Sequence, residues 1–236
     1  MGAMQSTVSA LSIRGQQTGA FFNSLPQEAR SDLQALWHVS GYASGVALFS
    51  ERDAASGVRV VLEGEAKLSM NSADGKRLIL RIAKKGEVLG LASALSGRPL
   101  EMTAETLYPA RIAYVQRSHF LSFLARHPEV YEMVTEELGR SYTLACHQLR
   151  TVGLSASAPE KLARLLLEWS ENGQTTERGT RCRFPLTHGE IGEFIGASRE
   201  TVTRTLSIFK SRRLVDFHGS TLTIPSRAAL ETLAHC

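Results

Sequence analysis

The sequence predicts an α+β protein in which an antiparallel β unit comes first, a long helix follows, and a small helical unit with two short strands ends the chain. The first observation is a series of short apolar segments between residues 42 and 116, separated by turn-forming residues. The second is an apolar stripe at helical spacing through 128–153. The third is a pair of helices after residue 186, both with capping signals and split by a glycine.

Composition bounds the classes of protein that need to be considered. The 236 residues suffice for one large domain or two modest ones, and a net charge of +4 permits a nucleic-acid partner without requiring one. Three cysteines, Cys146, Cys182 and Cys236, lie far apart without metal-binding spacing, which favours a reducing compartment over a disulfide scaffold. We find no secretory leader and no run of about 18 apolar residues, so we expect a cytoplasmic protein without a membrane partner.

The N-terminal half predicts a β unit preceded by a helix. Residues 18–40 carry apolar side chains at helical spacing and predict one short helix. Asp74-Gly75 lies between two apolar segments and predicts a hairpin. Strands this short and this regularly separated indicate a compact antiparallel barrel or sandwich.

The stretch 128–153 predicts one long helix that begins near Pro128 and ends at Gly153. Apolar residues recur there at spacings of three and four: Val134, Leu138, Tyr142, Ala145, Leu149 and Val152. A stripe longer than two heptads is typical of a coiled-coil seam, so we expect this helix to join two copies of the chain. The alternative is that the stripe packs on the β unit of its own chain.

The C-terminal part predicts a helix-turn-helix with a two-stranded wing. A polar linker near 154–157 leads to Ser157 and Glu160, which have the spacing of a capping box, as do Thr187 and Glu190. Gly196 suits the tight turn and Ser198 caps the second helix. We expect the following residues to be buried in this unit: Ile191, Phe194, Ile195, Val202, Leu206 and Phe209. The segments 214–218 and 220–224 predict the wing.

The opposite face of the second helix carries groups that can recognise bases. Arginine can donate two hydrogen bonds to guanine, and the Glu200 carboxylate can accept one from cytosine. Arg199, Glu200 and Arg204 are therefore predicted to contact bases, because an acid is repelled by phosphate and serves no purpose in non-specific binding. Five further residues are assigned to the same DNA interface, some of them as phosphate contacts: Thr187, His188, Ser198, Thr201 and Thr203. The alternative is an amphipathic helix with a solvated charged face.

The stretch "IGEFIGASRETVTRTL" resembles the DNA-binding signature of the CRP/FNR superfamily of bacterial transcription regulators, and the resemblance extends over nearly the whole chain. It implies a jelly-roll-like antiparallel β roll of the cyclic-nucleotide-binding type over 18–127, a dimerisation helix over 128–153 and a winged helix-turn-helix over 157–236. It also implies a homodimer that binds double-stranded DNA at a pseudo-palindromic TGTGA-like site and contacts RNA polymerase.

The effector region departs from the cyclic-AMP-binding members of that family. Leu91 stands where they carry a ribose-binding glutamate, and Leu100-Glu101 stand where they carry the phosphate-binding arginine and serine. We therefore expect no cofactor and no dependence on cyclic nucleotide, and an effector of another kind stays unidentified. The assigned effector pocket comprises Gly90, Leu91, Ala92, Ser93, Arg98, Tyr142 and Cys146.

Other interpretations stay open at this point. Arg98 could replace the missing arginine in a classical nucleotide-activated regulator, or Cys146 could act as a redox or nitrosative sensor. A receptor whose output is a protein contact is a further alternative. An enzyme is not predicted, because we find no nucleophile–base pair, no metal-ligand spacing and no phosphate loop, and hence no catalytic or metal-binding residue.

Overall fold

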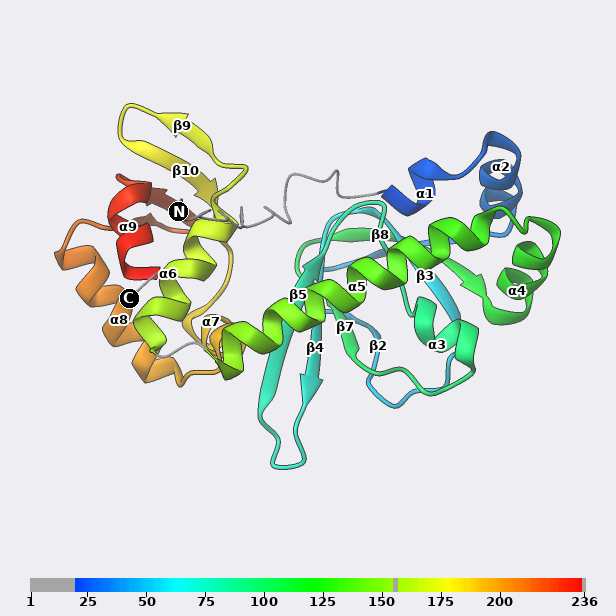
Figure 1. The fold of residues 1–236 in the computed structure, drawn as a ribbon, viewed down its shortest axis with the longest axis horizontal. Helices are drawn as coiled ribbons and strands as arrows, with labels where there is room; N and C mark the ends of the chain where they lie inside the picture. The colour runs from blue at the N-terminus through cyan, green and yellow to red at the C-terminus, as the bar shows by residue number, and fades with distance from the viewer. Residues whose placement is uncertain (1–19, 155–156, 235–236) are drawn as a thin grey trace, which may run out of the picture.

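The computed structural model describes residues 20–154 and 157–234. Residues 18 and 19 of the predicted first helix, and Cys236, lie outside this range. Figure 1 shows an elongated molecule with a β unit at one side, a smaller mixed unit at the other, and the helix α5 (Val130–Gly153) running across the first towards the second. Within the described residues, no helix is both long and apolar enough to cross a membrane.

The β unit consists of two four-stranded antiparallel sheets. One has the strand order β1-β8-β3-β6 and the other β2-β7-β4-β5. Their bounds are β1 His38–Tyr42, β2 Ala47–Phe49, β3 Gly57–Glu63, β4 Ala66–Asn71, β5 Arg77–Ala83, β6 Val88–Leu89, β7 Thr103–Thr106 and β8 Ala110–Gln116. The predicted hairpin is confirmed: β4 pairs with β5 around Gly75, whose positive φ of 81° suits glycine.

Short helices cover the outer face of the first sheet. They are α1 (Ala20–Ser24), α2 (Gln27–Ala35), α3 (Leu91–Ser96) and α4 (Arg117–Arg126). The prediction of a single helix over 18–40 was wrong. Pro26 separates α1 from α2. Residues 38–42 form the strand β1, which pairs with β8 at the edge of the first sheet.

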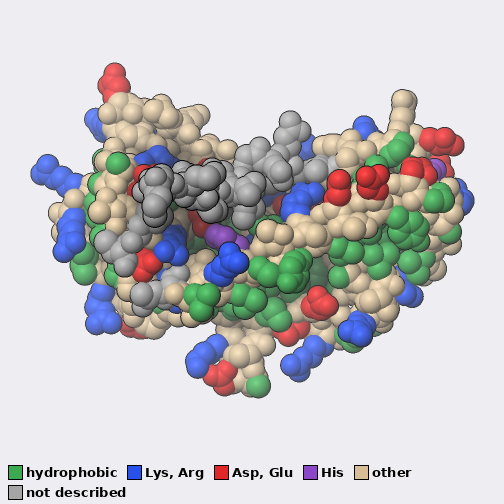
Figure 2. All heavy atoms as spheres, in the orientation of Figure 1, with side chains coloured by type: hydrophobic (Ala, Val, Ile, Leu, Met, Phe, Trp, Pro, Cys, Tyr) green, Lys and Arg blue, Asp and Glu red, His purple; other side chains and the backbone are tan. Residues whose placement is uncertain are grey.

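The long helix α5 covers Val130–Gly153, so it ends where the sequence predicted but begins two residues after Pro128. Its side chains divide between two faces. Val134 is buried against the β unit, whereas Tyr142 and Leu149 are exposed by 73% and 65%. Figure 2 shows hydrophobic side chains gathered along this helix on the face turned to the viewer. The self-packing alternative thus applies to Val134 but not to the exposed part of the stripe.

The C-terminal unit combines helices with one sheet of strand order β11-β12-β10-β9. Its elements are α6 Ala158–Trp169, β9 Gln174–Thr176, β10 Gly179–Arg183, α7 His188–Ile195, α8 Arg199–Ser211, β11 Asp216–His218, β12 Thr221–Ile224 and α9 Arg227–Ala234. The predicted wing is confirmed as β11 and β12. Helix α9 was not predicted, and the region before α7 forms the hairpin β9–β10.

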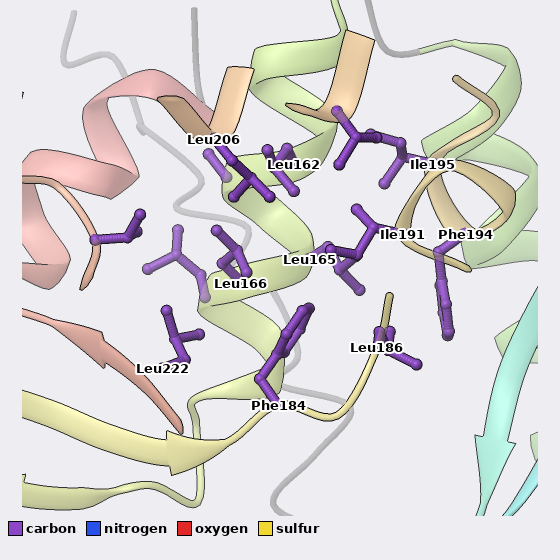
Figure 3. Packing of buried hydrophobic residues seen from close by; sticks show 14 of the residues in the cluster. Leu162, Leu165, Leu166, Phe184, Leu186, Ile191, Phe194, Ile195, Leu206 and Leu222 are labelled. Carbon is purple, nitrogen blue, oxygen red and sulfur yellow. The ribbon is translucent and has the colours of Figure 1, made fainter. Parts of the chain in front are cut away.

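The core of this unit forms around α6. Figure 3 shows Leu162 and Leu166 of that helix packed towards Ile191, Leu206 and Phe184. Two residues of the β unit, Ile79 and Leu107, belong to the same buried cluster. The two units therefore share one continuous apolar contact.

Candidate DNA-binding site

Helix α7 begins with a complete capping box, as the sequence predicted. The Thr187 hydroxyl accepts from the Glu190 backbone N–H at 3.2 Å, and the Glu190 carboxylate accepts from the Thr187 backbone N–H at 2.9 Å. The box at α6 is only half formed. Ser157 accepts from the Glu160 backbone N–H, but the Glu160 carboxylate pairs with Arg164 at 2.7 Å instead.

Two glycines set the angle between α7 and α8. Gly196 follows α7 with a φ of 66°, which confirms the predicted turn glycine. Gly192, inside α7, was not singled out from the sequence. A Cβ at Gly192 would lie 2.5 Å from the Ala197 carbonyl oxygen, so glycine permits the close approach of the turn to the helix.

Helix α8 separates its two faces as predicted. Ser198 caps it by accepting from the Thr201 backbone N–H at 3.2 Å. Val202, Leu206 and Phe209 are buried against α6 and the sheet. The opposite face is exposed and carries Arg199, Glu200, Thr203, Arg204 and Ser207.

The charge of this exposed face is mixed at its start. Helix-start backbone N–H hydrogen bonding, followed by a hydrogen bond from Ser198 and the nearby charges of Arg199 and Arg204, lowers the pKa of Glu200. The carboxylate is therefore ionised at neutral pH and can only accept hydrogen bonds. The two arginines can only donate. The helix thus presents one acceptor between two donors.

His188, the first residue of α7, contacts the exposed face of α8. The distance between His188 Nδ1 and Thr203 Oγ1 is 2.8 Å, and the Thr203 hydroxyl donates to the Arg199 carbonyl oxygen at 2.9 Å. Because a hydroxyl has one hydrogen, His188 donates through Nδ1. This links the start of α7 to the residues assigned to base contact.

The hydroxyls assigned to phosphate also make hydrogen bonds within the chain. Thr187 donates its hydrogen to the Glu190 carboxylate at 2.9 Å, so the capping box occupies it. The hydroxyls of Ser198 and Thr201 share one hydrogen bond of 3.0 Å, and Ser198 also donates to the Glu200 carboxylate. A phosphate bound by either of these hydroxyls would therefore replace a hydrogen bond within the chain.

A hollow of about 310 Å³ lies where the wing meets the two helices. Its lining includes His188 from α7, Lys210 from α8, and Phe217 and Gly219 from the wing. The Lys210 ammonium lies 5.3 Å from the centre of the Phe217 ring. The wing is thereby held beside the helix-turn-helix, with a basic side chain at the junction.

The residues assigned to an effector pocket fall into two separate groups. Gly90 caps α3, where Leu91 is buried in the apolar cluster under the short helices. Ser93 donates to the Pro99 carbonyl oxygen at 3.2 Å, while Ala92 and Arg98 are exposed. No hydrogen bond or ion pair described for residues 20–154 joins this group to the second one.

The second group lies on the outward face of α5. A hydrogen bond with Cys146 raises the pKa of Tyr142; the Tyr142 side chain is exposed and that of Cys146 is partly exposed. Leu100 is buried inside the β unit, whereas Glu101 is exposed. Leu91 therefore lies in a buried apolar cluster, whereas Tyr142 faces outward.

Comparison with known proteins places this architecture in a family. Residues 40–127 match the model of a cyclic nucleotide-binding domain, and residues 160–233 match that of a Crp-like helix-turn-helix domain. The transcriptional activatory protein AadR of Rhodopseudomonas palustris is 30% identical over 175 residues, which cover 74% of this chain and 72% of that protein. The chain belongs to the CRP/FNR family of transcription regulators. It is accordingly a DNA-binding regulator and not an enzyme.

Further members of the CRP/FNR family share most of the chain. A CRP-like cAMP-activated global transcriptional regulator of Mycobacterium tuberculosis is 26% identical and covers 78% of this chain and 82% of its own. The solved structure of the c-di-GMP responsive regulator CLP of Xanthomonas campestris superposes with a TM-score of 0.75 at 18% identity, covering 85% of this chain and all of that one. The CLP likeness supports the fold.

Proposed function

We propose that this protein is a homodimeric regulator that recognises a pseudo-palindromic, TGTGA-like DNA site without requiring cyclic AMP. The observation that carries the proposal is the exposed Arg199–Glu200–Arg204 face of a fully capped helix-turn-helix. In this proposal the arginines donate to guanine and Glu200 accepts from cytosine, each good contact contributing about 1–3 kcal/mol of discrimination. Ser198 and Thr201 bind phosphate and fix the register.

The proposed dimer forms through α5. Four apolar side chains on this helix are wholly or partly exposed and recur with a heptad spacing: Tyr131, Leu138, Tyr142 and Leu149. A second copy of the same helix, related to the first by a twofold axis, would cover this stripe. The two recognition helices then reach successive major grooves about 34 Å apart.

The proposed independence from cyclic AMP follows from the chemistry of the cassette. Leu91 offers no acceptor for a ribose hydroxyl and its side chain is buried elsewhere, in the cluster under the short helices. The Glu101 carboxylate would repel a cyclic phosphate. Relatives differ in this respect, since the M. tuberculosis regulator is named as cAMP-activated and CLP as responsive to c-di-GMP.

We assign the β roll over 18–127 to sensing, 128–153 to dimerisation and 157–236 to DNA binding, with RNA polymerase as the further partner. In this assignment no cofactor is required. Two alternatives are nucleotide activation through the exposed Arg98 and oxidation of Cys146 beside Tyr142.

Fluorescence anisotropy of the full chain tests the proposal. A TGTGA-type palindrome and a scrambled duplex are compared at near-physiological salt, alone and with cyclic AMP or cyclic GMP. We expect selective binding without nucleotide. Equal affinity for both duplexes would contradict sequence-specific recognition, and selectivity only with nucleotide would favour Arg98 as a phosphate partner.

A further inference from the structure

A cluster of charged side chains joins the β unit to the helix-turn-helix. It contains Lys67 of β4, Arg77 of β5, Glu105 of β7, and Glu190 and Glu193 of α7, and is called here the β4–α7 cluster. Lys67 Nζ lies 2.6 Å from Glu190 Oε1 and 2.7 Å from Glu105 Oε1. Arg77 donates to Glu105 at 3.1 Å and lies 3.7 Å from Glu193.

The Lys67 side chain is only 8% exposed, so this contact is not an ordinary surface ion pair. Burial disfavours the ammonium, but hydrogen bonds to the two carboxylates outweigh it and raise the pKa of Lys67. Burial likewise opposes the charge of Glu190 and Glu105, yet Lys67 holds the pKa of each below its ordinary value. The three groups are therefore charged together at neutral pH.

Glu190 has two roles in the structure. Its Oε2 accepts the backbone N–H and hydroxyl of Thr187 and so starts α7, while its Oε1 accepts from Lys67. One carboxylate therefore caps the first helix of the helix-turn-helix and ties that helix to a strand of the β unit.

A second contact fixes the other end of α7. The buried Gln148 side chain of α5 donates to the Ile79 carbonyl oxygen at 3.0 Å and to the Phe194 carbonyl oxygen at 2.7 Å. Ile79 lies on β5 and is fully buried in the core that it shares with the C-terminal unit. Helix α7 is thus bound to the β unit near its first turn and near its last.

The position of α7 determines that of α8, because Gly192 brings the turn between them into close contact. With the β4–α7 cluster formed, the exposed face of α8 is free of the β unit and open to DNA. Buried ion pairs contribute little net stability compared with apolar replacements, which points to a geometric role for the cluster.

We infer that Lys67 is a positioning residue for DNA recognition: through Glu190 it fixes the orientation of the helix-turn-helix on each protomer, and so the half-site spacing that the dimer accepts. This rests on the proposed dimeric palindrome binding. Lys67 contacts no DNA in this scheme. It acts on how two recognition helices are placed relative to each other.

The variant Lys67→Met, with its folding checked by chemical denaturation, tests this. Glu105 keeps Arg77 and Glu190 keeps Thr187, so neither carboxylate loses every partner. Lys67→Arg is the conservative variant. Arg111→Met is the matched control, since Arg111 pairs with Glu63 at 2.8 Å within the β unit and away from α7.

Affinity is measured for a single half-site and for palindromes with the best spacer or one base pair more or less. We expect Lys67→Met to weaken binding to the best palindrome by roughly 5- to 20-fold, a typical coupling between sites. Its preference among spacers should flatten, while half-site affinity stays within about twofold. Lys67→Arg should regain part of the preference and Arg111→Met should match the wild type.

An unchanged spacer profile in Lys67→Met would overturn the inference, as would an equal loss on the half-site. A second readout does not depend on DNA. Spin labels at positions 63 and 177, both exposed, report the distance between the two units in a background without the native cysteines. The inference requires a broader distance distribution in Lys67→Met. Wild-type protein that binds neither the palindrome nor the half-site more tightly than scrambled DNA would refute the proposed function. The spin-label distances would still decide whether Lys67 holds the two units in one orientation.

Discussion

At the start of α8, an acid lies between two arginines on an exposed helix face. The backbone N–H groups at the start of α8 stabilise the Glu200 carboxylate. Ser198 already caps this helix, however, so capping alone does not require an acid at position 200. A carboxylate there weakens attraction to phosphate, which is why we propose that it accepts a hydrogen bond offered by a particular base pair. The residue types and their spacing made this assignment possible from the sequence.

Arg199→Ala and Arg204→Ala should each relax the preference at one base position of the half-site. The expected cost is about 1–3 kcal/mol of discrimination, because one bidentate contact to guanine is lost. Competition binding against every single-base variant of the half-site measures it. Arg178→Ala, an exposed arginine between β9 and β10, serves as the control and should leave base preference unchanged. If both test variants keep the wild-type profile, the recognition assignment is wrong.

Gly192→Ala should destabilise the C-terminal unit. The new Cβ would lie 2.5 Å from the Ala197 carbonyl oxygen, and overpacking of this kind costs about 1–3 kcal/mol. Gly189→Ala is a matched control in the same helix, since the nearest atom to its Cβ would be 3.8 Å away. Chemical denaturation gives both free energies of unfolding. Equal effects of the two substitutions would contradict the close approach at Gly192.

Gly192 also shows a limit of sequence reasoning at this scale. Gly196 could be predicted because it ends a helical pattern where positive φ is expected. Gly192 has ordinary helical geometry, and its requirement arises from a neighbouring carbonyl oxygen that only the folded chain brings near.

At the scale of elements, the apolar stripe of α5 has a buried part and an exposed part. The sequence predicted the stripe and its end at Gly153, but periodicity could not assign each residue to the β unit or to a second chain. Val134 is buried in the β unit, and Tyr131, exposed by 48%, extends the outward face by one heptad from Leu138.

Leu149→Glu should therefore convert the proposed dimer into monomers. A charge on each of two facing helices removes apolar contact and adds repulsion within the stripe. Sedimentation velocity reports the mass. Thr143→Glu, on another exposed face of α5, is the control and should stay dimeric. A dimer that survives Leu149→Glu would rule out this face as the interface.

An ion pair between His127, just before α5, and Asp32 of α2 should make the stability of the protein depend on pH. The hydrogen bond that the His127 ring donates to Asp32 of α2 raises the pKa of His127 and lowers the pKa of Asp32; the ring nitrogens lie 3.1 Å from Asp32 and 3.2 Å from Glu129. Because the His127 pKa is raised, its contribution is complete below the unfolded value of about 6.5 and is lost as pH rises through the folded value. Because the Asp32 pKa is lowered, its contribution is lost only as pH falls through that lowered value.

Asp32→Asn should therefore flatten the increase in unfolding free energy that occurs as the pH falls from the raised folded pKa of His127 to the unfolded value of about 6.5. Denaturation curves at several pH values measure it. Arg126 also contacts Asp32, at 3.0 Å, so the comparison is made on the slope with pH rather than on stability at one pH. An unchanged slope would show that this contact does not couple to folding.

Other elements escaped prediction for physical reasons. Helix α3 has only six residues and is positioned by Gly90 and Gly97 at either end, both with positive φ, so no helical period is visible. Helix α9 reads as an alanine-rich end of the chain, and its burial against α6 through Leu230 comes from tertiary packing. The capping box at α6 is incomplete because the Glu160 carboxylate pairs with Arg164, one helical turn further along.

At the scale of the whole molecule, the structure differs from the sequence prediction mainly in the contacts that join the two units. The sequence predicted a β unit, a helix and a helix-turn-helix in the correct order. It gave no sign that Lys67 and Glu190, 123 positions apart, would meet, because ion pairing between distant segments leaves no periodic trace. The β4–α7 cluster and Gln148 convert two adjoining folds into one arrangement with the recognition face outward.

The predicted effector pocket combines residues from the region of α3 with residues from α5. The residues assigned to the effector pocket lie in two groups, with Leu91 buried in one and Tyr142 exposed in the other. The family resemblance supplied the alignment of the cassette, but the absent glutamate and arginine removed the chemistry that would have gathered these residues around a nucleotide.

Selection of binding sites from a random DNA library is the measurement that tests the central claim most directly, because it presupposes no sequence. The full chain without added nucleotide should enrich two inverted TGTGA-like half-sites at one fixed spacing, about one helical turn apart. Arg199→Ala should lose the preference at one position in each half-site. Enrichment of no motif, or of a single half-site without an inverted partner, would contradict a dimeric regulator that reads DNA through α8.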